Sequence, residues 1–155
     1  MKIPFVDLYA QYQSIKTDID AAIEKTIFHS SYIGGPAIKD FEQAFAAYAG
    51  VKHVVACANG TDSMEIILKA WGVGEGDEVI VPAHSWISTS EAVGNVGARP
   101  VFVDVEADYF TIDVSLIEKA ITSRTKVIIP VHLYGHPADM PAIMELAANY
   151  QLKVM

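Results

Sequence analysis

The chain has 155 residues, a formal net charge of -8 and no cluster of Lys and Arg, which excludes nucleic acid and anionic membrane surfaces as partners. Its 52% hydrophobic and 19% charged residues exclude a disordered chain and indicate a globular domain with a core. A single cysteine, Cys57, excludes an internal disulfide. The polar N-terminus excludes a signal peptide, and the lack of an 18-residue apolar run excludes a membrane span. We therefore expect a cytoplasmic protein.

Two amphipathic helices are predicted at the start of the chain. Isoleucines at helical spacing predict a helix over residues 14–28. Apolar residues at the same spacing mark a second helix, with Pro36 in its first turn and Gly50 just past its end. We assign residues 1–50 to this leading helical region.

From residue 51 onward, short apolar runs alternate with helical patterns. The runs predict strands over residues 53–58, 78–83, 100–105, 126–133 and 152–155. The helices between them are predicted over residues 61–71, 85–96, 114–121 and 140–150, the last two capped by Asp113 and Asp139. Continuous apolar strands separated by helices indicate an α/β fold over 51–155, with a mainly parallel sheet and flanking helices on both faces.

Two further expectations follow from this pattern. The strand over 53–58 would place Cys57 in buried packing rather than at a reactive site. The strand over 152–155 has no helix after it to cover it, so we expect the chain to be a fragment of a longer one.

In open parallel sheets, ligands bind beyond the carboxyl ends of the strands. The loop after the first predicted strand continues into a helix through Asn59, Gly60, Thr61, Asp62 and Ser63. Gly60 is expected to allow a tight turn and a close approach, and the free amides at the helix start suit a phosphate. A simple helix cap is the alternative, because the loop has neither the P-loop nor the G-x-G-x-x-G pattern.

Aromatic and imidazole side chains follow the next predicted strand. Trp86 is a candidate to lie flat on a planar cofactor, with a core tryptophan as the alternative. His84 is a candidate general base, with a structural, hydrogen-bonded histidine as the alternative.

Possible metal ligands occur in the two remaining loops. Asp104, Glu106 and Asp108 do not have the spacing of a calcium loop and are expected to be solvated charges. His132 and His136 would need a third ligand to hold zinc, and the sequence offers no candidate. We therefore predict no metal site.

Six segments together resemble a known family, the DegT/DnrJ/StrS family of aminotransferases, which use pyridoxal 5′-phosphate (PLP) and act on nucleotide-linked keto sugars. The segments follow the order and spacing of the family over essentially the whole chain. They are residues 3–15, 32–50, 58–68, 76–93, 97–113 and 128–140.

The resemblance implies a fold-type-I PLP transferase, of which residues 1–155 would be the N-terminal portion of the large domain. It implies that Gly60 and Thr61 bind the cofactor phosphate, that Asp62 adjoins them in the same turn, and that Trp86 stacks on the pyridine ring. It also places residues 7–12 and 32–35 near the sugar-nucleotide pocket or a dimer contact. His132, Tyr134 and Gly135 would lie near the active site without an assigned role.

The resemblance also shows what the chain does not contain. The family's Schiff-base lysine and the Asp that pairs with the pyridine nitrogen correspond to positions beyond Met155. No lysine of the chain is predicted at the carboxyl end of a strand: Lys52, Lys126 and Lys153 start strands, and the others are Lys2, Lys16, Lys25, Lys39, Lys69 and Lys119. We therefore predict no catalytic residue in this chain and no transamination by the chain alone.

The family implies a homodimer that transfers an amino group from an amino-acid donor, glutamate, to a nucleotide-linked keto sugar in amino-sugar and polysaccharide biosynthesis. Two alternatives stay open. One is a PLP-dependent sugar dehydratase of the same family, in which a histidine replaces the lysine. The other is a truncated, non-catalytic interaction module.

Overall fold

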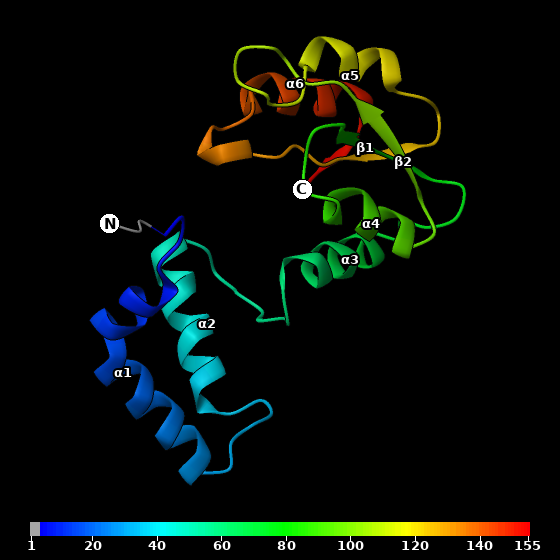
Figure 1. The fold of residues 1–155 in the computed structure, drawn as a ribbon. Helices are drawn as coiled ribbons and strands as arrows, with labels where there is room; N and C mark the ends of the chain where they lie inside the picture. Colours follow the sequence, from blue (N-terminus) through cyan, green and yellow to red (C-terminus); the bar gives the residue numbers. More distant parts are fainter. Residues whose placement is uncertain (1–3) are drawn as a thin grey trace. The chain divides into compact units, whose positions relative to one another are not determined.

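The computed structural model describes residues 4–155, so Met1–Ile3, and with them Lys2, lie outside the described residues. The chain forms two compact units, one up to Ala56 and the other over Cys57–Met155 (Figure 1). The first unit holds the helices α1 (Leu8–Phe28) and α2 (Pro36–Ala49). No helix within residues 4–155 is long and apolar enough to cross a membrane.

Helix α1 begins six positions before the predicted start at residue 14. The Asp7 carboxylate caps it by accepting a hydrogen bond from the Ala10 amide at 2.9 Å. The prediction missed the first turns of α1 because it followed only the isoleucine stripe, which begins at Ile15. Ile15 has non-helical backbone angles, so α1 is kinked there. The predicted second helix is confirmed, with Gly50 closing α2 at a φ of 68°.

The second unit contains a four-stranded sheet in the order β2-β1-β3-β4, in which every neighbouring pair is parallel. This confirms the predicted α/β fold with a parallel sheet. The strands are β1 (Glu78–Pro82), β2 (Arg99–Val103), β3 (Thr125–Ile128) and β4 (Lys153–Val154).

Helices cover both faces of this sheet (Figure 1). They are α3 (Gly60–Ala70) and α4 (Ser88–Asn95) on one face, and α5 (Val114–Ala120) and α6 (Met140–Tyr150) on the other. The central strand β1 divides its side chains between the two layers. Val79 and Val81 pack with α3 and α4, whereas Ile80 packs with α5 and α6. Burial on both faces explains why this strand is apolar throughout its interior.

The predicted strand over residues 53–58 is wrong. These residues pair with none of the described strands, and Val55 is 84% exposed. A β-strand needs a neighbour for its backbone hydrogen bonds, and here the Ala56 amide donates instead to the Glu42 carboxylate at 2.9 Å. Cys57 is consequently an exposed free thiol rather than a buried one, and Lys52 does not start a strand.

Several other predicted elements are shorter than expected, and the difference is largest for β3 and α4. The strand predicted over residues 126–133 ends at Ile128, although the Ile129 amide still donates to the Ile80 carbonyl at 2.9 Å. Pro130 has no amide hydrogen to continue the ladder. Helix α4 begins at Ser88 rather than at residue 85. The shortening leaves longer loops beyond the carboxyl ends of β1 and β3.

Candidate functional site

The start of helix α3 has backbone donors that lack an acceptor among the described residues. Asn59 is extended, and its side-chain oxygen accepts a hydrogen bond from the Asp62 amide at 2.9 Å, while its carbonyl accepts one from the Ser63 amide at 3.1 Å. Within residues 4–155, the amides of Gly60 and Thr61 have no acceptor. Two free amides and the positive end of the helix dipole favour an anion at this turn.

Gly60 contributes open space rather than an unusual backbone conformation. It is not among the glycines with positive φ, so the backbone angles at this position do not themselves require a glycine. A Cβ atom placed at Gly60 meets no other atom within 4 Å, so the side of the helix start that a ligand would approach is unobstructed. The turn itself is made by the extended backbone of Asn59.

The side chains of this turn divide into those already paired and one that is not. The Ser63 hydroxyl donates to the Gly60 carbonyl at 2.7 Å, and the Asp62 carboxylate accepts from the Asn59 side-chain amide at 3.2 Å. The half-buried Thr61 hydroxyl has no such bond among the described residues. Thr61 therefore offers both an amide and a hydroxyl to an anion.

Trp86 lies in the loop between β1 and α4. The Ala83 amide donates to the Val103 carbonyl at 2.8 Å, which extends the pairing of β1 with β2 by one residue. The Ser85 and Thr89 hydroxyls then lie 2.9 Å apart at the start of α4. The Trp86 side chain is 77% exposed, so the core alternative for this tryptophan is wrong in this structure.

The two predicted parts of the site lie on neighbouring elements of one sheet face. Helices α3 and α4 pack together, and the Asn95 side-chain amide donates to the Glu65 carboxylate at 2.7 Å between them. Helix α3 precedes β1, so it runs from the carboxyl edge toward the amino edge of the sheet, and its free amides face the same edge as Trp86. No hydrogen bond or ring contact joins residues 60–62 to Trp86 among the described residues.

Aromatic and imidazole rings from the loops that follow β1, β2 and β3 form a cluster. The His84 Nε2 atom is 3.5 Å from the Tyr134 hydroxyl oxygen. The His84 ring centre lies 6.4 Å from that of Tyr134 and 6.3 Å from that of Phe110. Tyr109 and His136 stack nearly parallel, with ring centres 4.4 Å apart and planes 7° apart. Sequence reasoning singled out His84, Tyr134 and His136 but missed Tyr109 and Phe110.

Two of these aromatic residues have left-handed backbone conformations. Phe110 has a φ of 60° and Tyr134 a φ of 55°. Bulky residues rarely adopt such angles, and strained residues of this kind gather at functional sites. No local sequence signal identifies them, because a Phe or Tyr in a loop normally predicts ordinary backbone angles.

The possible metal ligands of these loops have structural partners. The Asp104 carboxylate accepts from the Val105 amide at 2.8 Å, and the Glu106 carboxylate accepts from the Thr111 hydroxyl at 2.8 Å. The His132 Nδ1 atom accepts from the Ala138 amide at 3.1 Å. No group of three His, Cys, Asp or Glu side chains suited to a metal occurs in the described part of the chain.

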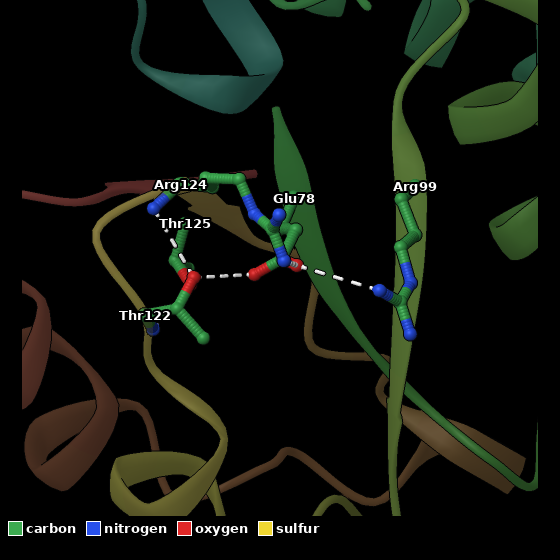
Figure 2. Close-up of polar contacts among 5 residues, drawn as sticks. All are labelled: Glu78, Arg99, Thr122, Arg124 and Thr125. Carbon is green, nitrogen blue, oxygen red and sulfur yellow. Dashed lines mark hydrogen bonds and ion pairs between the residues drawn. The ribbon is translucent and has the colours of Figure 1, made fainter. Parts of the chain in front are cut away.

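The amino edge of the sheet carries a polar cluster that sequence reasoning missed. Glu78, at the start of β1, is 3% exposed, and its carboxylate accepts hydrogen bonds from the Thr122 hydroxyl and from Arg124 Nη2 (Figure 2). Arg99 Nη1 lies 3.8 Å from the same carboxylate. The hydrogen bond from Thr122, followed by the one from Arg124, holds the pKa of Glu78 below its usual value. The cluster joins three segments at the edge opposite Trp86, so it belongs to the framework and not to the candidate site.

A family model for the DegT/DnrJ/EryC1/StrS aminotransferase family matches residues 13–155. The chain is 45% identical to the dTDP-3-amino-3,4,6-trideoxy-alpha-D-glucose transaminase of Streptomyces venezuelae, covering 99% of this chain and 41% of that protein. It is also 45% identical to the UDP-2-acetamido-2-deoxy-3-oxo-D-glucuronate aminotransferase of Pseudomonas aeruginosa, with 99% of this chain and 43% of that protein covered. The chain thus spans about two fifths of the length of these relatives.

Solved structures of related proteins have the same fold over this length. S. venezuelae DesV, in complex with a ketimine intermediate, matches with a TM-score of 0.96 and 45% identity over 99% of this chain and 41% of its own. NtdA of Bacillus subtilis, with bound cofactor PMP, matches with a TM-score of 0.94 and 38% identity over 99% of this chain and 35% of its own. The predicted family resemblance and fold are therefore confirmed.

Proposed function

This chain belongs to the DegT/DnrJ/EryC1/StrS aminotransferase family, whose cofactor is PLP, and on that premise we propose that it supplies the phosphate-anchoring and ring-stacking part of a PLP site. The enzyme containing that site would transfer an amino group to a nucleotide-linked keto sugar. The observation that carries the proposal is the pair of free amides of Gly60 and Thr61 at the carboxyl edge of a parallel sheet.

The residues of this edge fit the two ends of the cofactor. The Gly60 and Thr61 amides and the Thr61 hydroxyl would bind the phosphate, and the open space at Gly60 would admit it. Asp62 would hold Asn59 in place, so that the first turn keeps its free amides directed outward. The exposed Trp86 ring would stack on the pyridine ring. When bound, PLP supplies an electron sink for chemistry at the amino-bearing carbon.

The substrate class follows from the names of two relatives, which act on a dTDP-linked and a UDP-linked sugar. We propose a nucleotide-linked keto sugar as the amino acceptor, glutamate as the donor and a homodimer as the working form of the enzyme.

The positions of the lysines support a limit on what these 155 residues do alone. Lys126 and Lys153 lie in the strands, at or near their amino ends, and Lys69 and Lys119 lie in the last turns of helices. None of the described lysines lies in the loops that follow β1, β2 or β3. We propose that the chain by itself binds cofactor without forming a covalent lysine adduct and does not transaminate.

A PLP titration of the chain tests the cofactor proposal. We expect reversible binding that weakens roughly tenfold in Thr61→Ala, which loses a hydrogen bond to a charged group, and that also weakens in Trp86→Ala. The matched controls are Thr17→Ala and Tyr48→Ala, which remove an exposed threonine and an exposed tyrosine from α1 and α2. Wild-type affinity in both site variants, or no binding by the wild type, would contradict the proposal. A lysine adduct detected by mass spectrometry after borohydride reduction would contradict the limit on the chain alone.

A further inference from the structure

The Trp86 side chain has little to hold it in place. It is 77% exposed, and it forms none of the aromatic contacts found among residues 4–155. A mobile side chain loses conformational freedom when a ligand stacks on it, which weakens binding. A stacking residue therefore benefits from a neighbour that fixes the loop carrying it, and the loop between β1 and α4 contains one such neighbour, His84.

His84 lies two residues before Trp86, between rings that come from two other loops. Phe110 belongs to the loop after β2, and Tyr134 belongs to the short 3-10 helix after β3. The His84 ring centre is 6.3 Å from Phe110 and 6.4 Å from Tyr134, and its Nε2 atom points toward the Tyr134 hydroxyl at 3.5 Å. The imidazole is thus held from two directions by elements distant in the sequence.

The loops that supply these rings are themselves held by hydrogen bonds. In the loop after β2, the Phe110 amide donates to the Glu106 carbonyl at 3.1 Å, and the Glu106 amide donates to the Thr111 carbonyl at 3.0 Å. In the loop after β3, the His136 amide donates to the Leu133 carbonyl at 3.0 Å.

The two loops are also joined to each other and held in strained conformations. The stacked rings of Tyr109 and His136, 4.4 Å apart, connect them. The left-handed backbones of Phe110 and Tyr134 persist because these surrounding contacts over-determine them.

We propose that His84 is a positioning residue for the cofactor ring: packed between Phe110 and Tyr134, it fixes the loop that carries Trp86, so that the indole is already in place when the ring binds. This inference rests on the proposed function, which assigns Trp86 to the ring. It assigns His84 a role in packing and orientation and not in proton transfer.

The test uses the 155-residue chain with a Trp71→Phe background, so that Trp86 is the only tryptophan. The first readout needs no ligand: the fluorescence anisotropy of Trp86 and its quenching by acrylamide. The second is the affinity for pyridoxamine 5′-phosphate, which has no aldehyde to react with lysines, compared with the affinity for inorganic phosphate. The variants are His84→Ala and His84→Phe, with His53→Ala as the control, since His53 is an exposed histidine of the other unit.

We expect His84→Ala to lower the anisotropy of Trp86, to increase its quenching, and to weaken pyridoxamine 5′-phosphate binding about three- to tenfold, the range for ordering one or two side chains on binding. Phosphate affinity should stay unchanged, because the free amides of α3 are untouched. His84→Phe should restore both readouts by retaining a ring in the same place. If His84→Ala itself unfolds, Tyr134→Asn removes one side of the same contact, and asparagine tolerates the left-handed backbone.

Unchanged Trp86 anisotropy and cofactor affinity in a folded His84→Ala or Tyr134→Asn chain would overturn the inference. Failure of His84→Phe to restore them would also overturn it, because a polar role for His84 would then be required. If the wild type binds neither pyridoxamine 5′-phosphate nor phosphate, the proposed function fails. The ligand-free anisotropy still decides whether His84 fixes Trp86.

Discussion

The two units of this chain contain the same kinds of apolar side chain but bury them very differently. Ile19 of α1 is 38% exposed, whereas Ile80 of β1 is completely buried. No side chain of α1 or α2 is buried, while all five residues of β1 are. An apolar stripe thus identifies the side chains that share a face of a helix or strand. The number of helix and sheet layers packed against that face decides how deeply those side chains are buried.

The contacts that stabilise the two units differ in the same way. In the helical unit they are local: the Asp7 cap of α1, and the Phe41 and Phe45 rings stacked one helical turn apart at 5.6 Å. In the α/β unit the two cores combine side chains from strands and helices that are distant in the sequence. We therefore expect substitutions in the α/β unit to have cooperative effects and substitutions in α1 to have local ones.

The largest effect is expected from a cavity in the sheet core. Ile80→Ala should lower the free energy of unfolding by about 2–5 kcal/mol, because the fully buried side chain packs between the sheet and helices α5 and α6, and the site collapses only partly. Ile19→Ala, the same change on an exposed helix face, should cost less than about 1 kcal/mol. Urea unfolding followed by circular dichroism measures both. Equal losses would mean that the helical unit has a core of its own.

A smaller effect is expected at Glu78, which joins β1 to the turn before β3. The pKa of Glu78 is lowered in the folded chain, first by the hydrogen bond from Thr122 and then by Arg124. The contribution of Glu78 to stability is therefore present above the unfolded pKa and is lost as the pH falls through the folded pKa. The loss should begin below about pH 4.3, the ordinary value for Glu.

The measurement for Glu78 is the difference in stability between Glu78→Gln and the wild type across pH. The wild type should be more stable at neutral pH, and the two should converge in acid. Glu145→Gln, a change at an exposed residue of α6, should show no such convergence. A constant difference between Glu78→Gln and wild type from neutral to acid pH would contradict the assignment.

Helix caps sharpen the comparison because each unit has a helix capped by an aspartate side chain. Asp139 caps α6 through the Ala142 amide at 3.2 Å, as Asp7 caps α1 through the Ala10 amide. Asp139→Ala should lower the global unfolding free energy by about 1 kcal/mol. Asp7→Ala should instead speed amide hydrogen exchange in the first turns of α1 and leave the α/β unit unchanged. Exchange that increases throughout the α/β unit in Asp7→Ala would show that the two units unfold together.

The smallest effect is expected from the ion pair of Lys16 and Asp20 on α1. Both side chains are nearly half exposed, and Tyr12 also donates to Asp20 at 2.7 Å. The Lys16 hydrogen bond lowers the pKa of Asp20, but solvent screening weakens such surface pairs. Asp20→Asn should leave the unfolding midpoint within error of the wild type at any salt concentration. A salt-dependent drop in stability would make this pair more important than its exposure indicates.

The elements that could be predicted from sequence are those with local signals. The apolar run after Asp77 predicted β1, and the capping aspartates Asp113 and Asp139 predicted the starts of α5 and α6. The strand over 53–58 could not be rejected in this way, because its apolar residues satisfy the pattern and only the lack of a neighbouring strand decides the outcome.

The candidate site was predictable in part for the same reason. Trp86 stands in the loop after β1, so its placement at the carboxyl edge of the sheet followed from the strand pattern. Residues 60–62 were expected after a strand over 53–58, but they begin α3, and their place at the same edge follows from the direction of that helix. The left-handed backbone conformations of Phe110 and Tyr134 could not be predicted, since tertiary contacts and not local preference maintain them. The hydrogen-bond partners of Glu78 could not be predicted either, because Thr122 is 44 positions away along the chain.

The strand order β2-β1-β3-β4 also determines how long β1 waits for its neighbours during synthesis of the chain. The central strand β1 emerges from the ribosome before both of its neighbours, and the last of them, β3, begins only at Thr125. At about 5–20 residues per second, β1 waits several seconds for that partner. Its five residues, which are all buried once the sheet has formed, stay exposed to solvent during that interval. Synthesis rate between Pro82 and Thr125 should therefore affect the yield of soluble chain, and a holding chaperone would protect this segment most.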